Sequence, residues 1–198
     1  TFDLTGLPPT PEELQDFEQD SAPDAFLKVI DRLLAASAYG EKWGRHWLDV
    51  VRYADTAGET ADYPVPEAWR YRNYVIEALN SDLPFDQFVR EIITATGSTH
   101  ENGAANFFAL HQDPEGMAET TAQAFMGLSI NCARCHNHPL EKWTNDQYYG
   151  FANLFARVRS KGWGGDFRSG DGLRVVFVEP RGELLQPGKS QPQSPRPL

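Results

Sequence analysis

Hydrophobic residues along most of this chain recur every three or four positions, the period of amphipathic α-helices. In the second such segment, Phe26, Val29 and Leu33 fall on one side of a helix. The period changes near the C-terminus, where residues 173–178 form a β-branched run typical of a strand. The pattern therefore predicts a mainly α fold, a multi-helix orthogonal or bundle-like domain of roughly six or seven helices with a small β element near the C-terminus.

Helix starts are expected near residues 11, 23, 41, 67, 84, 113 and 144, with the second helix stopping before Tyr39 and the third running to Asp55. Two of these starts have capping-box spacing, since Thr10 precedes Glu13 by three positions and Thr144 precedes Gln147 by three. At a third start, a capping aspartate is followed by proline and glutamate, which suit the first turn of a helix.

Composition divides the chain into three zones. Residues 1–159 carry the helical pattern, residues 160–183 hold a glycine-rich loop and the short β element, and residues 184–198 are rich in Pro, Gln and Ser. The last zone is interpreted as a linker to a downstream domain. The chain starts without methionine in the middle of a pattern, so it is interpreted as a piece of a longer protein.

The charge of the chain narrows the classes of partner. Its formal net charge is −10 and its pI is about 4.9, whereas a nucleic-acid-binding domain carries a basic surface. No apolar run approaches the roughly 20 residues that span a bilayer. We therefore expect no nucleic-acid partner and no membrane insertion by this segment. Aromatic residues make up 12% of the chain, which suits a flat apolar cofactor as well as an ordinary core.

The segment Cys132-Ala133-Arg134-Cys135-His136 has the C-x-x-C-H pattern of a c-type haem attachment site. At this spacing each thiol can form a thioether with one vinyl group of a haem, and the next residue offers an imidazole to the iron. Cys132 and Cys135 are thus the predicted attachment residues, and His136 is the predicted proximal iron ligand. The chain has two cysteines, too few for an all-cysteine zinc or iron–sulfur site. The motif predicts one covalent haem c.

Two other chemistries use the same residues. A redox disulfide expects a strand before the cysteines and a βαβ context, whereas a helical pattern precedes them here. A zinc site built from Cys132, Cys135, His136 and His138 would take four donors from seven residues, which is cramped for a tetrahedron. Both alternatives stay open beside haem attachment, which is favoured.

The predicted helix 41–55 has an apolar side that includes Trp43 and a charged side opposite, with His46 on the boundary. Arg45 and Asp49 lie four positions apart on the charged side, as expected of a solvated, salt-bridged face. The pattern alone does not separate a solvated face from a functional one.

Four segments in order resemble one known family: residues 4–11 (LTGLPPTP), 45–55 (RHWLDVVRYAD), 68–72 (AWRYR) and 132–139 (CARCHNHP). From Leu4 to about Phe155 the chain is similar to the second planctomycete cytochrome c domain family, a domain of unknown function found in large exported proteins. The resemblance implies a haem and neighbouring domains in a parent protein, including another cytochrome c domain.

The resemblance also favours a cofactor or pocket role for residues 45–55 over a solvated face. His46 is then a candidate sixth iron ligand or distal hydrogen-bond donor. Arg52, Arg70 and Arg72, with Tyr53 beside them, are candidate partners of the haem propionates, because arginine pairs carboxylates in a fork. Other candidate axial ligands are Met117, Met126, His111 and His138.

The sequence is therefore interpreted as a monohaem c-type cytochrome domain that transfers electrons within a larger exported redox protein. One alternative is a haem enzyme or sensor for peroxide or another small oxidant, with His46, Arg52 and Tyr53 as catalytic candidates. Another is a non-catalytic interaction module with a disulfide or metal at the cysteine pair. Because haem c is attached outside the cytoplasm, a periplasmic or otherwise exported location is expected.

Overall fold

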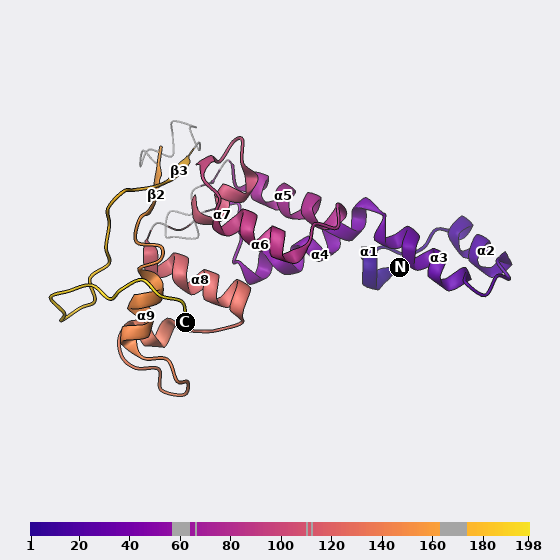
Figure 1. The fold of residues 1–198 in the computed structure, drawn as a ribbon. Helices are drawn as coiled ribbons and strands as arrows, with labels where there is room; N and C mark the ends of the chain where they lie inside the picture. Colours follow the sequence, from indigo (N-terminus) through magenta and orange to yellow (C-terminus); the bar gives the residue numbers. More distant parts are fainter. Residues whose placement is uncertain (57–63, 66, 110, 112, 163–173) are drawn as a thin grey trace.

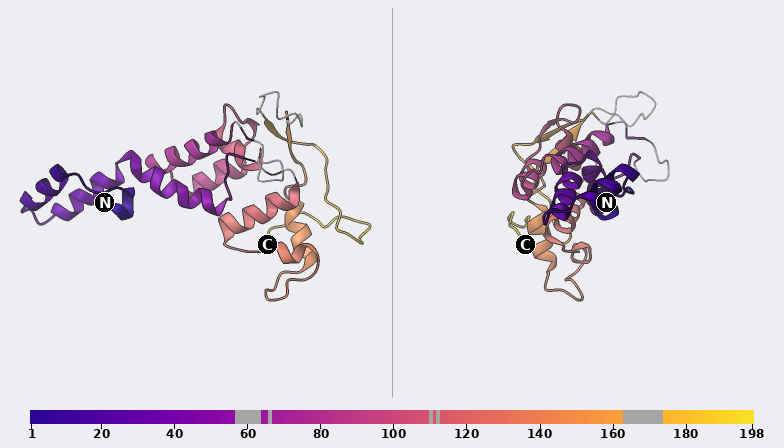
Figure 2. Two further views of the ribbon diagram at one scale, coloured as in Figure 1. Left: turned by 180° about the vertical axis from the view of Figure 1, so that it is seen from behind. Right: turned by 90° about the vertical axis from the view of Figure 1, so that its right-hand side faces the viewer.

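The computed structural model describes residues 1–56, 64–65, 67–109, 111, 113–162 and 174–198, and it confirms the mainly α prediction. Seven helices of eight or more residues lie in this part of the chain, beside two single-turn α-helices and three short strands. The molecule is elongated, with α1–α3 at one end and the strands and α9 at the other (Figures 1 and 2). Within the described ranges, every helix is too short or too polar to cross a lipid bilayer.

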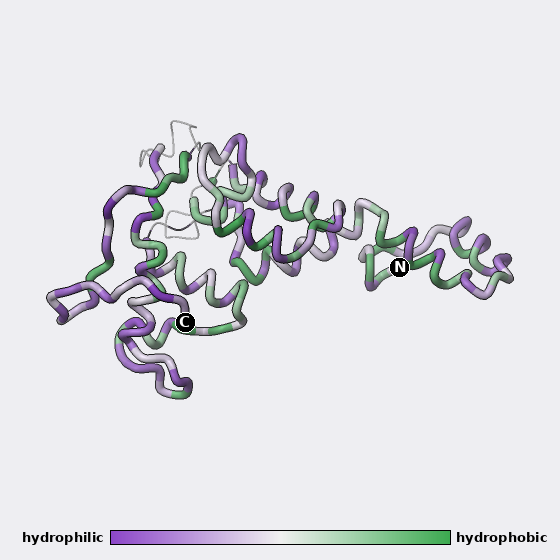
Figure 3. The backbone as a smooth tube through the Cα atoms, in the orientation of Figure 1, coloured by the Kyte–Doolittle hydropathy of each residue, from purple (hydrophilic) through white to green (hydrophobic). Residues whose placement is uncertain are grey.

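The N-terminal arm consists of α1 (Phe2–Thr5), α2 (Pro11–Gln19) and α3 (Ala25–Leu34). The predicted capping box is present at α2: the Thr10 hydroxyl accepts from the Glu13 amide at 3.2 Å, and the Glu13 carboxylate accepts from the Thr10 amide at 2.9 Å. Hydrophobic positions on α1 and α3 stand out in green in Figure 3.

The apolar side predicted for α3 is only partly covered. Leu33 is buried, but the side chain of Phe26 is 65% exposed. The arm is joined to the rest of the molecule mainly where α1 packs against α4.

Helix α4 (Ser37–Val50) starts before the expected position and runs through Gly40, where the sequence predicted an interruption. That prediction was wrong because this glycine serves a close approach to α5 (Ala68–Asn80). A Cβ atom on Gly40 would lie 2.5 Å from the carbonyl oxygen of Ile76, and the Gly40 amide donates to Oδ1 of Asn80 at 2.8 Å.

The same helix ends at Val50, five residues before the predicted end at Asp55. Arg52 takes a left-handed backbone conformation with φ 55°. The amide of Tyr53 donates to the Leu48 carbonyl at 2.9 Å, and that of Arg52 donates to the Asp49 carbonyl at 3.2 Å. This is a Schellman motif with arginine in the position that glycine usually takes.

The hydrophobic core lies where α5 meets α6 (Phe85–Ile93), α7 (Asn106–Ala109), α8 (Pro114–Met126) and α9 (Asn145–Ala152). The predicted starts of α5, α6, α8 and α9 are confirmed within one or two residues. The largest fully buried side chains are Tyr71, Val75, Ile92, Phe107, Phe108, Met117, Ile130 and Tyr148.

Three strands form a small antiparallel sheet in the order β1-β3-β2. They are β1 (Gly97–Ser98), β2 (Val158–Lys161) and β3 (Val175–Val178), and β3 confirms the predicted β element. Val158 pairs with Val178 in the sheet register. Leu173 and nearly all of the predicted glycine-rich loop lie outside the described residues.

The C-terminal segment 184–198 contacts α9 along its length. Asn153 donates to the Leu184 carbonyl at 3.0 Å and accepts from the Leu184 amide at 2.8 Å. The Arg196 amide donates to the Gly150 carbonyl at 3.0 Å. These contacts hold a polar segment against a helix that begins next to the cysteine motif.

Candidate functional site

Both cysteines of the motif lie on the surface around one short 3₁₀ turn, η2 (Asn131–Arg134). They are free thiols, and both are exposed. Ala133 between them is fully buried, and its amide donates to the carbonyl of the buried Ile130 at 2.8 Å. Burial of the small central residue leaves the two flanking thiols exposed to solvent.

Asn145, the first residue of α9, ties this turn to the helix. Its side-chain amide donates to the carbonyls of Ala133 at 2.6 Å and Arg134 at 2.9 Å. Its backbone amide donates to Oδ1 of Asn137 at 2.9 Å. Carbonyls in a 3₁₀ turn of this length lack intrahelical donors, so Asn145 supplies the partners that the turn itself does not.

His136 is exposed, and its Nδ1 lies 2.7 Å from the carbonyl oxygen of Asn137. Because a carbonyl oxygen only accepts hydrogen bonds, Nδ1 carries the proton in this contact. The lone pair of the neutral ring is then at Nε2. A histidine held in this way has the tautomer and orientation of a metal ligand that binds through Nε2.

His138 is arranged differently. Its Nδ1 accepts from the amide of Glu141 at 2.9 Å and that of Leu140 at 3.3 Å. The proton of its neutral ring is therefore at Nε2, so neither nitrogen offers a free lone pair. In the described part of the chain, no group of three or more His, Cys, Asp or Glu side chains is placed to hold a metal ion. The geometry gives the four-donor zinc alternative no support.

The motif is also tied to α8 through charges. The Arg134 guanidinium lies 3.6 Å from a carboxylate oxygen of Glu115 and 4.0 Å from one of Glu119. The Tyr148 hydroxyl donates to Glu119 at 2.7 Å. Burial raises the pKa of Tyr148, and this hydrogen bond raises it further, so the hydroxyl keeps its proton and remains a donor.

The polar residues after α4 form a cluster with partners of its own. Arg52 donates to Oε1 of Gln123 on α8 at 3.0 Å. The Tyr53 hydroxyl donates to Asp55 at 2.5 Å, and the same carboxylate lies 3.9 Å from Arg72. Burial raises the pKa of Tyr53, with a further contribution from Asp55. The structure thus places two predicted site residues, Tyr53 and Arg72, beside Asp55, and a third, Arg52, against α8.

Arg70 points to a different set of partners. It contacts Glu67, donates to Nδ1 of His100 at 2.7 Å, and has its guanidinium 4.4 Å from the ring centre of Trp69. Arg52, Arg70 and Arg72 therefore all have protein partners, and their predicted role with haem propionates stays a prediction.

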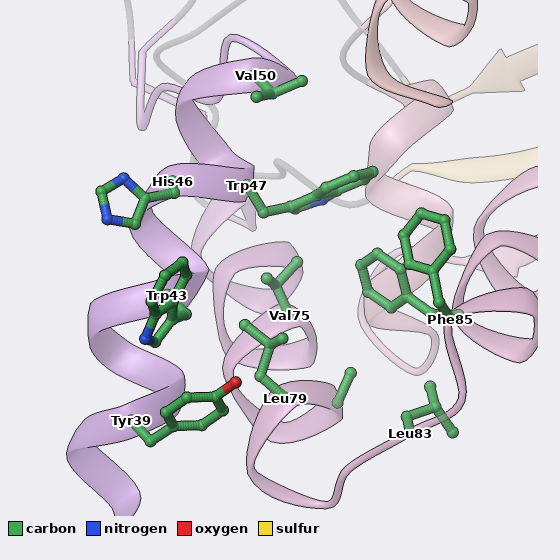
Figure 4. Close-up of a pocket in the computed structure, with 11 residues that line it drawn as sticks. Tyr39, Trp43, His46, Trp47, Val50, Val75, Leu79, Leu83 and Phe85 are labelled. Atoms are coloured by element: carbon green, nitrogen blue, oxygen red, sulfur yellow. The ribbon is translucent and has the colours of Figure 1, made fainter. Parts of the chain in front are cut away.

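His46 lies on the exposed side of α4, where its ring is 5.4 Å from that of Trp43. It is among the residues that line a groove bordered by Trp43 and Trp47 (Figure 4). Among the described residues, no hydrogen bond, ion pair or ring contact joins His46 to the cysteine turn. Its predicted distal role stays a prediction.

Of the other axial candidates, Met117 is buried and His111 is half-buried. Met117 is 2% exposed, and burial lowers the pKa of His111 to about 4. Met126 at the end of α8 is 42% exposed.

Sequence reasoning missed the residues that position the motif: Asn145, Glu115, Glu119 and Tyr148. The capping box at Thr144 and Gln147 is present and was a signal that a helix begins there. However, nothing local showed that its first residue would reach back to the cysteine turn. Glu115 is interpreted from the sequence as part of a helix start, and the contacts of Glu115 and Glu119 with Arg134 depend on how α8 packs against the cysteine turn.

Residues 1–160 match a family model described as PSCyt2, a protein of unknown function (DUF1549). Neither the curated proteins nor the solved structures contain a match to this chain. The family model covers the N-terminal arm, the core helices and the cysteine turn. The chain therefore belongs to the PSCyt2 family of proteins of unknown function.

Proposed function

We propose that this chain is a monohaem c-type cytochrome domain that transfers electrons within a larger exported redox protein. The observation that carries the proposal is the cysteine turn, which presents two free, exposed thiols next to an exposed imidazole with Nε2 available. Cys132 and Cys135 would hold the haem, and His136 would bind its iron. When bound, the haem supplies one-electron exchange at the iron.

The residues of the turn have separate parts in this function. Cys132 and Cys135 would each hold the haem through one carbon–sulfur bond, with the thiol proton taken up by the former vinyl group. Asn145 holds the turn in shape through the carbonyls of Ala133 and Arg134. The Asn137 carbonyl keeps the proton of His136 on Nδ1, which leaves the Nε2 lone pair free and would let it bind the iron.

Exposure of the turn supports electron exchange with another protein rather than chemistry in an enclosed cavity. Each residue of the alternative oxidant site already has a protein partner: Arg52 donates to Gln123, the Tyr53 hydroxyl donates to Asp55, and the His46 ring lies against Trp43. The resemblance to a planctomycete cytochrome c domain supports a neighbouring cytochrome c domain as redox partner. An exported, periplasmic location follows from the proposed haem c.

A pyridine haemochrome spectrum with an intact mass tests the proposal, on protein made in a periplasmic host with haem c maturation. We expect a c-type α-band and a mass increase of one haem. An apo mass, in a host that loads a control cytochrome, would overturn the haem assignment. The Cys132→Ala/Cys135→Ala protein should carry no covalent haem, and covalent haem in that protein would also refute the attachment residues.

The optical spectrum of the loaded protein then tests the distal side. If His46 is the sixth ligand, His46→Ala should change the Soret and visible bands, whereas His100→Ala at another exposed histidine should leave them unchanged. An unchanged spectrum in His46→Ala would remove His46 from the iron.

A further inference from the structure

A groove opens between α4, α5 and the start of α6, away from the cysteine turn. Its volume is about 390 Å³, within the range of small-molecule sites. Figure 4 shows Tyr39 and Trp43 from α4 on one side, Phe85 on the other, and Val75 and Leu79 from α5 between them. We call it the aromatic groove.

The groove is bordered by exposed apolar side chains. Trp43 is 41% exposed, Val50 is 40% exposed and Phe85 is 63% exposed. Trp47 continues the wall inward, with its ring 5.0 Å from that of Phe88 in an edge-on arrangement. Apolar side chains that line a groove and are exposed to water favour binding of an apolar ligand, because the ligand shields their surface from water.

The charge of the groove indicates the charge of its ligand. The chain has 46 acidic and basic residues, 28 of them Asp or Glu and 18 Lys or Arg. None of these four residue types is among the eleven that line the groove. A charged ligand would lose its hydration here without gaining a carboxylate, ammonium or guanidinium partner, so the lining favours an uncharged one.

The polar groups of the lining are the Tyr39 hydroxyl, the His46 imidazole and the indole nitrogens of Trp43 and Trp47. The Tyr39 hydroxyl is directed toward Leu79 in Figure 4. No other described residue makes a hydrogen bond to this hydroxyl. The indole nitrogen of Trp47 is already engaged, since it donates to the Tyr71 hydroxyl at 2.9 Å. Tyr39 can therefore orient a ligand that carries one oxygen.

We propose that the aromatic groove is a binding site for an uncharged, planar aromatic compound that carries a hydroxyl or carbonyl oxygen. The compound lies between the Trp43 and Phe85 walls, rests on Val75 and Leu79, and hydrogen-bonds through its oxygen to Tyr39. This site is separate from the proposed haem attachment and does not depend on it.

Calorimetric titration of the 198-residue chain with 2-naphthol tests the proposal. We expect saturable binding of one molecule per chain. Naphthalene-2-sulfonate has the same rings and a fixed negative charge, and it should bind at least tenfold more weakly, because no lysine or arginine lines the groove to pair with the charge. Absence of saturable 2-naphthol binding, or equal binding of the sulfonate, would overturn the proposal.

Three variants locate the site. Trp43→Ala and Phe85→Ala should each weaken 2-naphthol binding by about tenfold or more, and Tyr39→Phe by about fivefold through loss of one hydrogen bond. Trp69→Ala is the matched control, because Trp69 is 39% exposed and lies outside the groove. Circular dichroism shows whether each variant is folded. If one of the two wall variants, Trp43→Ala or Phe85→Ala, does not fold, binding by the other still tests the site.

Two further experiments distinguish a small ligand in the aromatic groove from a ligand bound elsewhere and from a second copy of the chain in the groove. The Cys132→Ala/Cys135→Ala protein should bind 2-naphthol as the unaltered chain does, so binding that needs the cysteines would place the ligand elsewhere and refute the proposal. A chain that forms dimers in light scattering, with dimers lost in Trp43→Ala and no 2-naphthol binding, would assign the groove to a second copy instead.

Discussion

Acidification should destabilise this protein through His111, which lies between α7 and α8. Its ring centre is 5.9 Å from that of Phe107. Burial lowers its pKa from 6.5 to about 4; nearby Asp113 opposes this shift, and Arg52 adds to it. The folded protein therefore keeps His111 neutral at a pH where the unfolded chain already binds a proton.

The size of the effect follows from the two pKa values. They differ by about 2.5 pH units, and each unit corresponds to roughly 1.36 kcal/mol, so the free energy of unfolding should fall by about 3 kcal/mol from this residue alone. The loss should begin as the pH drops below about 6.5 and should be complete near pH 4, because below that value both states bind the proton.

The assay compares urea unfolding of the unaltered chain and of His111→Gln at several pH values between about 7 and 4. Other titrating groups are common to both proteins, and packing lost with the imidazole is independent of pH. The difference in pH dependence therefore isolates His111. His46→Gln, which removes a histidine from the exposed side of α4, controls for the loss of a surface histidine.

The reasoning would be refuted if His111→Gln lost as much stability on acidification as the unaltered chain. A difference of the opposite sign, with the unaltered chain gaining stability as the pH falls, would mean that folding raises the pKa of His111. Either result would show that burial does not control this histidine.

Three other substitutions follow from local geometry. Gly40→Ala places a Cβ atom 2.5 Å from a backbone oxygen and should cost about 3 kcal/mol in urea unfolding, whereas at Gly44 the nearest contact is a side-chain carbon at 3.3 Å and the cost should be well below that. Asn145→Ala removes two hydrogen bonds to carbonyls of the cysteine turn and should lower the free energy of unfolding in urea by about 2 kcal/mol. Asn137→Ala removes one hydrogen bond and should lower it by less than about 1 kcal/mol. Asp82→Gly relieves a left-handed residue with φ 51° and should raise the midpoint urea concentration by the equivalent of about 0.5 kcal/mol, while an unchanged or lower midpoint would contradict the strain argument.

Helix starts were the most predictable part of the fold. Thr10 with Glu13 and Thr144 with Gln147 form the expected capping boxes. These features involve residues three positions apart, so the sequence pattern contains every atom that takes part in them. The β-branched run that became β3 was predictable for a similar reason, because it differs from the helical period around it.

Helix interruptions were less predictable. Gly40 was interpreted as a helix end, but its missing Cβ lets α5 pass close by, and the contact comes from a residue 36 positions away. Arg52 was placed inside a helix, but it ends one in a left-handed conformation. Local propensity does not encode either result, because each depends on which segment lies opposite.

The candidate site also has features that depend on local sequence and features that depend on distant segments. Cys132, Cys135 and His136 are predicted as haem ligands from their spacing alone, which involves residues within five positions of one another, and this role stays a prediction. The partners of Arg52, Arg70 and Arg72 came from distant segments, and so did the aromatic groove, whose lining joins three helices.

By itself, the sequence determined the mainly α class, the capped helix starts and the close placement of two thiols and an imidazole. Each rests on hydrogen bonds or covalent geometry within a few residues. The tertiary structure alone decided the α4–α5 crossing at Gly40, the anchoring of the cysteine turn by Asn145 and the uncharged lining of the groove. These depend on contacts between segments far apart in the chain, and such contacts form only when the whole hydrophobic core packs.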